Sequence, residues 1–330
     1  MPSLNHLSQT ESNAKKLCIW IFNDSRPGHL SQLEGLASRI QAHIDSDIYW
    51  LNVTEYGLSL SHLLIFPPKL KHLPKPDLIL GTGHRTHISV LMSGYQFKAF
   101  TCLIMRPSLP VCLFDAVICP THDGLAKSNR VFNTFGPINK IDQSIALLPK
   151  DERNLSLILI GGISKHYLFD TQKIIRQVKT VCHEAPEKKW LISNSPRTPP
   201  DMNQALERLS LPNATFFDYQ QNTQDPLQDL LLKAQLSWIT PDSMSMIFEA
   251  LSAGSTVGLF NCKAKSEKHG RIVKQVTRLL DKGYTHGFDH RSQLLNTSAK
   301  NFPWEADMAA QWLLHKYQDS VLNHKVKPHA

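Results

Sequence analysis

The sequence predicts an α/β protein with two Rossmann-like, doubly wound domains that face each other across a cleft, as in the GT-B fold. Short and almost continuously apolar runs recur along the chain, as expected of strands covered on both faces. Amphipathic segments lie between several of these runs, which is the pattern of a parallel sheet. A length of 330 residues also suffices for two separate cores.

The first domain is predicted over residues 17–145, after a polar N-terminal segment, 1–16, that we expect to be disordered. Its strands are expected at Leu17–Phe22, Ile48–Val53, Leu78–Leu80, Thr101–Met105, Ala116–Cys119 and Val131–Phe135. After the first strand, apolar residues recur at helical spacing, at Leu33, Leu36, Ala37 and Ile40. This stripe predicts an amphipathic helix.

The second domain is predicted over residues 146–302, with the linker within Ile138–Asn154. Its strands are expected at Leu155–Ile160, Trp190–Ser193, Thr215–Phe217, Leu236–Ile239 and Thr256–Phe260. The tail, 303–330, is predicted to form a helix at Pro303–Asn323 that packs back on the first domain. Its apolar side is expected at Trp304, Met308, Trp312 and Leu313.

The net charge of +8 is compatible with an anionic partner such as a nucleotide sugar, a nucleic acid or an acidic lipid surface. No basic stripe is interleaved with aromatic residues, so no nucleic-acid partner is expected. No run reaches the ~18 apolar residues of a membrane span, and the N-terminus lacks the pattern of a signal peptide. The six cysteines form no CxxC pair. We interpret them as reduced core thiols of a cytosolic protein, without zinc.

The strongest local pattern follows the run Leu236–Ile239 and predicts a helix that ends near Gly254. The free N–H groups and the dipole at the start of a helix suit a diphosphate. Glu249 shares a helical face with Asp242 and Ser245, where a carboxylate can accept hydrogen bonds from a ribose diol. The predicted diphosphate and ribose ligands are Asp242, Ser243, Met244, Ser245 and Glu249. The alternative is an ordinary capped helix with a solvated Glu.

A second pattern, Asn23–His29, lies between the first strand and the first helix. A neutral imidazole at His29 can take a proton from an acceptor hydroxyl. Asp24 is expected to orient His29 or to bind the acceptor. We therefore predict His29 and Asp24 as catalytic residues; the alternative is an Asx-type turn with a surface histidine.

A third pattern, Gly81–His87, resembles GxGxxG but has Thr86 in place of the third glycine. It is a weak dinucleotide signal. As a loop at a strand end it suits an anionic or hydroxylated ligand, or it is a plain helix N-terminus. The residues predicted on the acceptor side are Arg26, Gly28, Gly83, His84, Arg85 and Arg106. Arg106 follows a strand and can equally form a surface ion pair.

Two loops of the second domain are also predicted at strand ends. Gly161 and Gly162 permit a phosphate or a donor sugar to approach the backbone, and Ser195 and Arg197 lie in a polar loop with a cation. Either loop can equally be a plain turn. The Asp45–Asp47 segment matches a metal-binding DxD, but it precedes a strand and is interpreted as a solvated turn. No metal site and no cofactor are predicted.

Four of these segments resemble the mitochondrial fission Elm family: Asp24–His29, Gly81–Thr86, Ser195–Pro199 and Thr240–Met246. The resemblance extends over about residues 17 to 320. Bacterial members are regarded as glycosyltransferases of the GT-B type and plant members as mitochondrial-fission factors. A more distant likeness, at Gly28-His29 and Glu249, is to the lipid-linked N-acetylglucosaminyltransferase of peptidoglycan synthesis.

The resemblance and the residues together predict a metal-independent glycosyltransferase of the hexosyltransferase type. Its substrates are expected to be a nucleoside-diphosphate sugar and a glycan or lipid-linked acceptor of the cell envelope. We expect it in the cytoplasm, in peripheral contact with the inner face of a membrane. The alternatives are a non-catalytic membrane-associated scaffold and a sugar-nucleotide epimerase on the same two-domain fold.

Overall fold

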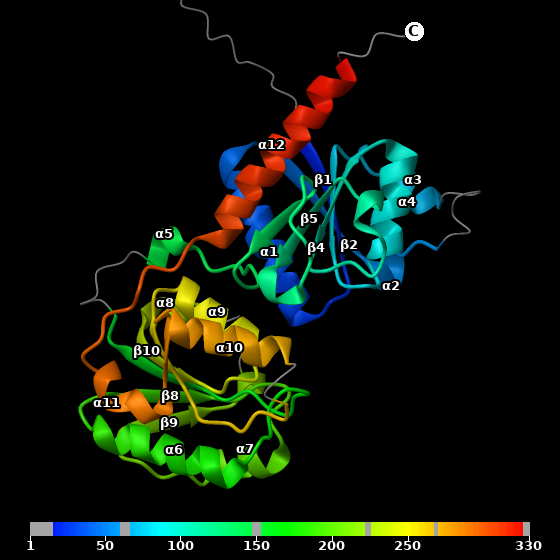
Figure 1. The fold of residues 1–330 in the computed structure, drawn as a ribbon. Coiled ribbons are helices and arrows are strands. Elements are labelled where there is room, and N and C mark those ends of the chain that lie inside the picture. The colour runs from blue at the N-terminus through cyan, green and yellow to red at the C-terminus, as the bar shows by residue number, and fades with distance from the viewer. Residues whose placement is uncertain (1–15, 60–66, 147–152, 222–225, 267–269, 326–330) are drawn as a thin grey trace, which may run out of the picture.

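The computed structural model describes residues 16–59, 67–146, 153–221, 226–266 and 270–325. Within these ranges the chain forms two six-stranded sheets whose neighbouring strands all pair in parallel. Figure 1 shows the two sheets as separate bodies, each with its own helices. The predicted fold class, two Rossmann-like α/β domains, is confirmed.

The first sheet has the strand order β2-β1-β3-β4-β5-β6. Its strands are β1 (Leu17–Asn23), β2 (Ser46–Asn52), β3 (Leu78–Thr82), β4 (Phe100–Ile104), β5 (Ala116–Pro120) and β6 (Val131–Thr134). Its helices are α1 (Pro27–His43), α2 (Val53–Tyr56), α3 (Pro68–Lys71), α4 (His87–Phe97) and α12 (Glu305–Lys325), with short 3-10 turns η2 (Val111–Leu113) and η3 (Thr121–Asp123).

The second sheet has the order β12-β11-β10-β7-β8-β9. Its strands are β7 (Leu155–Leu159), β8 (Trp190–Ser193), β9 (Ala214–Phe217), β10 (Ala234–Ile239), β11 (Thr256–Leu259) and β12 (Thr285–Gly287). Its helices are α6 (Thr171–Glu184), α7 (Pro200–Glu207), α8 (Pro226–Lys233), α9 (Met244–Ser252), α10 (Arg271–Asp281) and α11 (Arg291–Leu294), with 3-10 turns η5 (Tyr219–Gln221) and η6 (Phe288–His290).

The central strands are apolar throughout because both of their faces are buried. In β1, Ile19 and Ile21 pack in one core cluster, whereas Trp20 and Phe22 pack in the cluster on the other side of the sheet. In β7, Leu157 and Ile158 divide in the same way between the two clusters of the second domain. Successive side chains of a strand point to opposite faces, so each domain has two hydrophobic layers.

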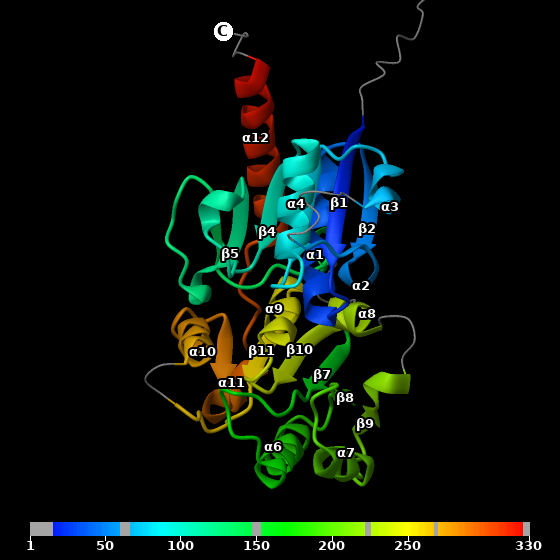
Figure 2. The ribbon, with the colours of Figure 1, turned by 90° about the vertical axis from the view of Figure 1, so that its right-hand side faces the viewer.

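The last helix, α12, packs on the first sheet beside α1, although it follows the second domain in sequence (Figures 1 and 2). The predicted stripe of α1, which includes Leu33 and Ile40, is buried in the same cluster. The apolar side of α12 is built mainly of Ala306, Ala309, Ala310, Leu313 and Leu314. Met308 was expected on that side, but it is 42% exposed. Alanines fit here because they allow two helices to lie close together.

The eleven predicted strands all form, and their ends lie within two residues of the expected positions. The strand β12 was not predicted, because Thr285–Gly287 contains no apolar run. All six cysteines are free, as expected, but Cys112 is exposed and therefore does not belong to a core.

The chain crosses between the two sheets twice. It leaves β6, passes through α5 (Gln143–Ala146) and enters β7, and it returns through residues 295–304 into α12 (Figure 1). The buried carboxylate of Glu305, at the start of α12, accepts hydrogen bonds from the N–H groups of Phe135 (2.6 Å) and Gly136 (3.0 Å). This side chain therefore ties the two crossing segments together.

Burial raises the pKa of Glu305 to about 7, although the two N–H donors and the charge of Arg278 oppose the shift. A carboxyl with a raised pKa in the folded state stabilises the fold below its unfolded pKa of 4.5. That contribution is lost as the pH rises through about 7.

We therefore expect wild type to lose up to about 3 kcal/mol of unfolding free energy, relative to Glu305→Gln, between about pH 4.5 and pH 7. Glutamine keeps the size of the side chain and one acceptor oxygen, but it does not titrate. Urea unfolding of both proteins at a series of pH values measures the difference. Two parallel profiles across this window would contradict the assignment.

Candidate functional site

The two domains meet at the first two turns of α1 and α9. In each sheet these helices follow a central strand, so both start at the carboxyl edge of their sheet. The Ser31 hydroxyl of α1 donates a hydrogen bond to Oε1 of Glu249 in α9, at 3.0 Å. A Cβ atom on Gly28 would lie 3.6 Å from the Ser245 hydroxyl oxygen. Figure 2 shows the two helices one above the other at the junction. The structure thus brings the predicted catalytic and donor segments together.

His29 and Asp24 form a hydrogen-bonded pair, with Nδ1 of His29 2.9 Å from Oδ1 of Asp24. The Asp24 side chain is 1% exposed and that of His29 is 15% exposed. Arg26 places its Nε 3.6 Å from the other carboxylate oxygen, Oδ2. If Nδ1 carries the proton that Asp24 accepts, Nε2 keeps a lone pair, which is the form required of a base.

The turn before α1 holds this pair in position. Ser25 lies in the left-handed region, with φ +61, and its N–H donates to the Asn23 side chain. Asn52, at the end of the neighbouring strand β2, donates to the Ser25 hydroxyl at 2.6 Å. Pro27 then starts the helix in the position that proline favours. The Asx-type turn of the alternative interpretation is therefore present, but it supports the His29–Asp24 pair and the histidine is largely buried.

Gly83, after β3, packs closely against the His29–Asp24 pair. Its φ is +81, and a Cβ atom at this position would lie 2.6 Å from Cε1 and 2.7 Å from Nδ1 of His29. It would also lie 3.1 Å from Oδ2 of Asp24. Only glycine accepts both this backbone conformation and this close approach. The loops after β1, β2 and β3 thus meet around His29.

At the start of α9, Ser243 is the N-cap residue, and its side chain makes no capping hydrogen bond. Thr240 and Asp242, which are also of residue types that can cap a helix, precede this position and are not the cap. Met244 and Ser243 are largely buried, whereas Ser245 is exposed. The hydroxyl of Ser245 and the N–H end of the helix therefore lie at the junction with α1.

The Asp242 carboxylate accepts hydrogen bonds from groups of its own domain. Its Oδ2 accepts hydrogen bonds from the Gly162 N–H (3.0 Å) and from Nη2 of Arg197 (3.2 Å). Burial raises the pKa of Asp242, and these two partners, with the Thr240 side chain, oppose the rise. Asp242 is thus a link between three loops at the carboxyl edge of the second sheet.

The two glycines of the second domain are in contact with the chain itself. A Cβ atom on Gly161 would collide with the Asp242 carboxylate, and one on Gly162 would collide with the Arg197 carbonyl. These close approaches are made by the protein itself, and the binding of a phosphate or a sugar at Gly161 and Gly162 stays a prediction. Ser195 likewise shapes its own turn, because its hydroxyl accepts from the Arg197 N–H at 3.3 Å.

Glu249 is partly buried, so the alternative of a solvated glutamate does not hold. Burial raises its pKa, and the hydrogen bond from Ser31 and the charge of Lys140 oppose the rise. Ser31 was not predicted as a site residue, although its position two residues after His29, on a helix with a buried face, was a usable signal. The contact itself joins residues 218 positions apart, which no local pattern predicts.

The other predicted acceptor-side residues lie around the same edge of the first sheet. His84 and Arg85 are exposed in the loop after β3. Arg106 follows β4, and its Nη1 donates to the Asp123 carbonyl at 2.9 Å. Arg271, at the start of α10, donates to the same carbonyl at 3.3 Å. Arg106 therefore binds within its own domain, to a carbonyl that also accepts a hydrogen bond from Arg271 of the second domain.

Neither a metal cluster nor a membrane helix is found in the part of the chain that the structure describes. There, no group of three or more His, Cys, Asp or Glu side chains could hold a metal ion. Likewise, no helix within the described ranges is both long enough and apolar enough to cross a bilayer. Asp45 and Asp47, the DxD pair, both approach the exposed Lys16, at 3.4 and 4.0 Å.

Two parallel six-stranded sheets with their helix starts at one junction define a two-domain α/β protein of the GT-B-like class. The model of the family "Mitochondrial fission ELM1" matches residues 27–317. The chain therefore belongs to this family. A curated relative, "Uncharacterized protein RP120" of Rickettsia prowazekii (strain Madrid E), is 23% identical over 86% of this chain and 96% of its own length.

Solved structures with a similar fold include UDP-GlcNAc 2-epimerases. The enzyme from Methanocaldococcus jannaschii has a TM-score of 0.56 and 12% identity, over 91% of this chain and 100% of its own. The enzyme from Neisseria meningitidis, bound to UDP-GlcNAc, has a TM-score of 0.54 and 15% identity, over 92% of this chain and 100% of its own. At such identities the likeness is one of fold.

We expect Gly83→Ala to displace His29 and to lower the free energy of unfolding by more than Gly283→Ala does. Both glycines have positive φ, +81 and +66, so both substitutions cost about 1–2 kcal/mol of backbone strain. Only Gly83 adds a clash, since nothing lies within 4 Å of a Cβ atom on Gly283. Denaturant unfolding and the NMR shifts of the His29 imidazole measure the effect. Equal losses with unchanged His29 shifts would show that the packing is not as described.

Proposed function

We propose that this protein is a glycosyltransferase that moves a sugar from a nucleoside-diphosphate sugar to a hydroxyl of a glycan or lipid-linked acceptor. The observation that carries the proposal is the junction of α1 and α9. There the helix that carries His29, the partner of Asp24, lies against a helix start and a carboxylate from the other domain. A transferase needs a general base for the acceptor hydroxyl and a binding site for the donor next to each other.

In this proposal the donor binds at the start of α9. The N–H groups of the first turn and the helix dipole hold the diphosphate, with the hydroxyls of Ser243 and Ser245. Arg197, whose side chain is 47% exposed, adds a cation beside them. These donors stabilise the charge that develops on the leaving diphosphate, so the proposed mechanism uses no divalent ion.

Glu249 holds the ribose by accepting hydrogen bonds from its diol. Its present partner, the Ser31 hydroxyl, is a donor of the same chemical kind, which supports this role. Donor binding then exchanges one hydroxyl for another at the same carboxylate. Because Ser31 belongs to the other domain, this exchange also loosens a contact between the domains.

His29 acts as the base. Asp24 accepts the Nδ1 proton, fixes the tautomer and stabilises the imidazolium that forms, while Nε2 takes the proton of the acceptor hydroxyl. The acceptor is held on the same edge of the first sheet, near Arg26, Gly28, Gly83, His84, Arg85 and Arg106. We propose that it is presented at the cytosolic face of a membrane, where the net charge of +8 favours an anionic surface.

A second candidate is a sugar-nucleotide epimerase, which the fold of the similar UDP-GlcNAc 2-epimerases favours. It would bind the same nucleotide sugar at the start of α9. An epimerase needs no acceptor. The two candidates are therefore distinguished by whether the protein converts the donor when no acceptor is present.

The donor site is tested by isothermal titration with UDP-, GDP- and ADP-sugars, and with a CMP-sugar that has one phosphate. We expect one diphosphate sugar to bind, and Glu249→Ala to weaken it by about tenfold or more, because a hydrogen-bonded carboxylate is lost. Ser31→Ala is the matched control: it removes the same contact between the domains but leaves the carboxylate, so the affinity is kept or improved. Binding of no sugar nucleotide, or equal binding by Glu249→Ala, would end the proposal.

The reaction is tested by NMR on the donor that binds, with and without glycan and lipid-linked acceptors. A transferase releases nucleoside diphosphate at a catalytic rate only with an acceptor, and we expect His29→Gln to lower that rate by roughly 100-fold or more at unchanged donor affinity. His315→Gln, an exposed histidine of α12, is the control. Conversion of the donor at a catalytic rate without any acceptor would instead identify the epimerase.

A further inference from the structure

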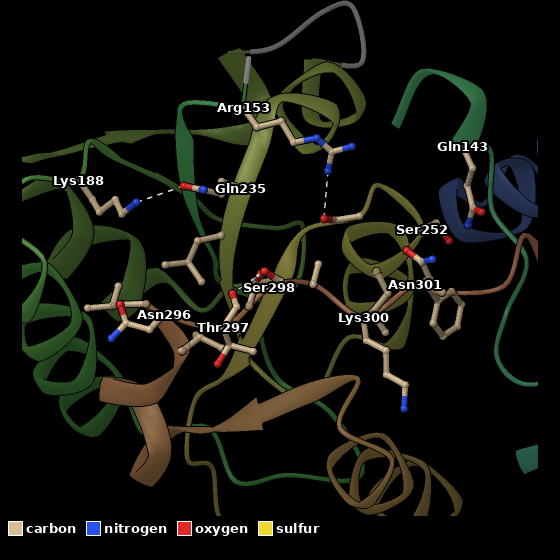
Figure 3. A pocket seen from close by; sticks show the side chains of 18 residues that line it. Gln143, Arg153, Lys188, Gln235, Ser252, Asn296, Thr297, Ser298, Lys300 and Asn301 are labelled. Carbon is tan, nitrogen blue, oxygen red and sulfur yellow. Dashed lines mark hydrogen bonds between the residues drawn. The ribbon is translucent and has the colours of Figure 1, made fainter. Parts of the chain in front are cut away.

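A cavity of about 680 Å³ lies in the second domain, at the starts of β10 and β11 (Figure 3). This is the amino edge of the sheet, and the proposed donor site lies at the opposite, carboxyl edge. Its volume is in the range of small-molecule sites. The returning segment, residues 294–302, forms one side of the cavity, and the end of α9 forms another.

The charged side chains that line this cavity are all cations. They are Arg153, Lys188 and Lys300, and among the described lining residues none is acidic. Lys188 donates to the side-chain oxygen of Gln235 at 3.1 Å, and Lys300 donates to the Lys282 carbonyl at 2.9 Å. Neutral oxygens satisfy these donors, and among the described residues no acidic side chain of the lining offsets the positive charge. The cavity therefore has a field that favours an anion.

Arg153 carries the most specific signal. It is 7% exposed, and its Nη1 donates to the carbonyls of Ala253 (2.8 Å) and Gly254 (3.0 Å), just beyond α9. Its Nε is buried and has no hydrogen-bond partner among the residues that the structure describes. Nor does any described carboxylate form an ion pair with it. A buried guanidinium without a counter-charge is costly, and it matches phosphate and carboxylate in geometry.

The remaining wall is partly apolar. Leu236, Leu251, Leu294 and Phe302 contribute to it, beside side-chain amides and hydroxyls such as Asn296 and Ser298 (Figure 3). Inorganic phosphate alone would leave this apolar surface uncovered. The lining thus fits a ligand with one anionic group and an apolar body.

We propose that this cavity is a second binding site, for a small organic anion that joins a phosphate or carboxylate group to an apolar body, with Arg153 as the ionic partner. It is separate from the proposed donor site and does not depend on it. The ligand would contact both the end of α9 and the segment that returns to the first domain.

The test uses the full-length protein and four probes: phenyl phosphate, benzoate, inorganic phosphate and benzyl alcohol. Isothermal titration is expected to show that phenyl phosphate or benzoate binds more tightly than the two others, and the tighter of the pair identifies the headgroup. If benzyl alcohol binds as well as both anions, or inorganic phosphate binds as well as phenyl phosphate, the proposal is overturned.

Two variants place the binding in this cavity. Arg153→Met keeps the length of the side chain without its charge and should weaken the best probe by about tenfold or more. Ser298→Tyr fills the cavity without touching Arg153 and should abolish binding. Ser292→Tyr, at an exposed position of α11 outside the lining, is its matched control. Equal affinity in Ser298→Tyr and Ser292→Tyr would mean that the probe binds elsewhere, and it would refute the site even if Arg153→Met fails to fold.

Discussion

The hydrogen bond from the Ser31 hydroxyl to the Glu249 carboxylate joins helices that belong to different sheets, and it marks the place where the carboxyl edges of the two sheets face each other. Parallel strands all end at one edge of a sheet, so the loops that carry polar side chains leave there in both domains. The contact of α1 with α9 turns these two edges toward each other. Without it, the His29–Asp24 pair and the start of α9 would be two unrelated surface features.

The His29–Asp24 pair is positioned by its neighbours more than by its own helix. Asn52 of one adjacent loop fixes the turn at Ser25, and Gly83 of another leaves just enough space for the imidazole. A side chain that is held from several strands at once loses little further freedom when a ligand arrives. Asp242 has the corresponding role in the second domain, where it joins the Gly162 and Arg197 loops.

The sequence predicted the strands well because most are buried on both faces and therefore apolar. Where that cause is absent the prediction failed, as in the short β12, and α12 was misjudged at Met308 because alanines form its packed side. Local patterns reveal where a strand ends and the next helix begins, and they were enough to locate His29, Asp24 and Glu249. Their partners did not: a motif shows that Asp242 can accept hydrogen bonds, but only the fold shows that Gly162 and Arg197 donate them. For the same reason, the contacts that Gly161 and Gly162 make with Asp242 and Arg197 were not predicted.

The position of α12 also bears on the order in which the protein matures on the ribosome. One hydrophobic layer of the first sheet is completed by Ala309, Leu313 and their neighbours, which are synthesised after every strand of both sheets. The second domain, in contrast, draws its core from one continuous stretch of chain. The first domain therefore emerges first but keeps part of one apolar face uncovered until α12 has been synthesised, which exposes that face on the nascent chain.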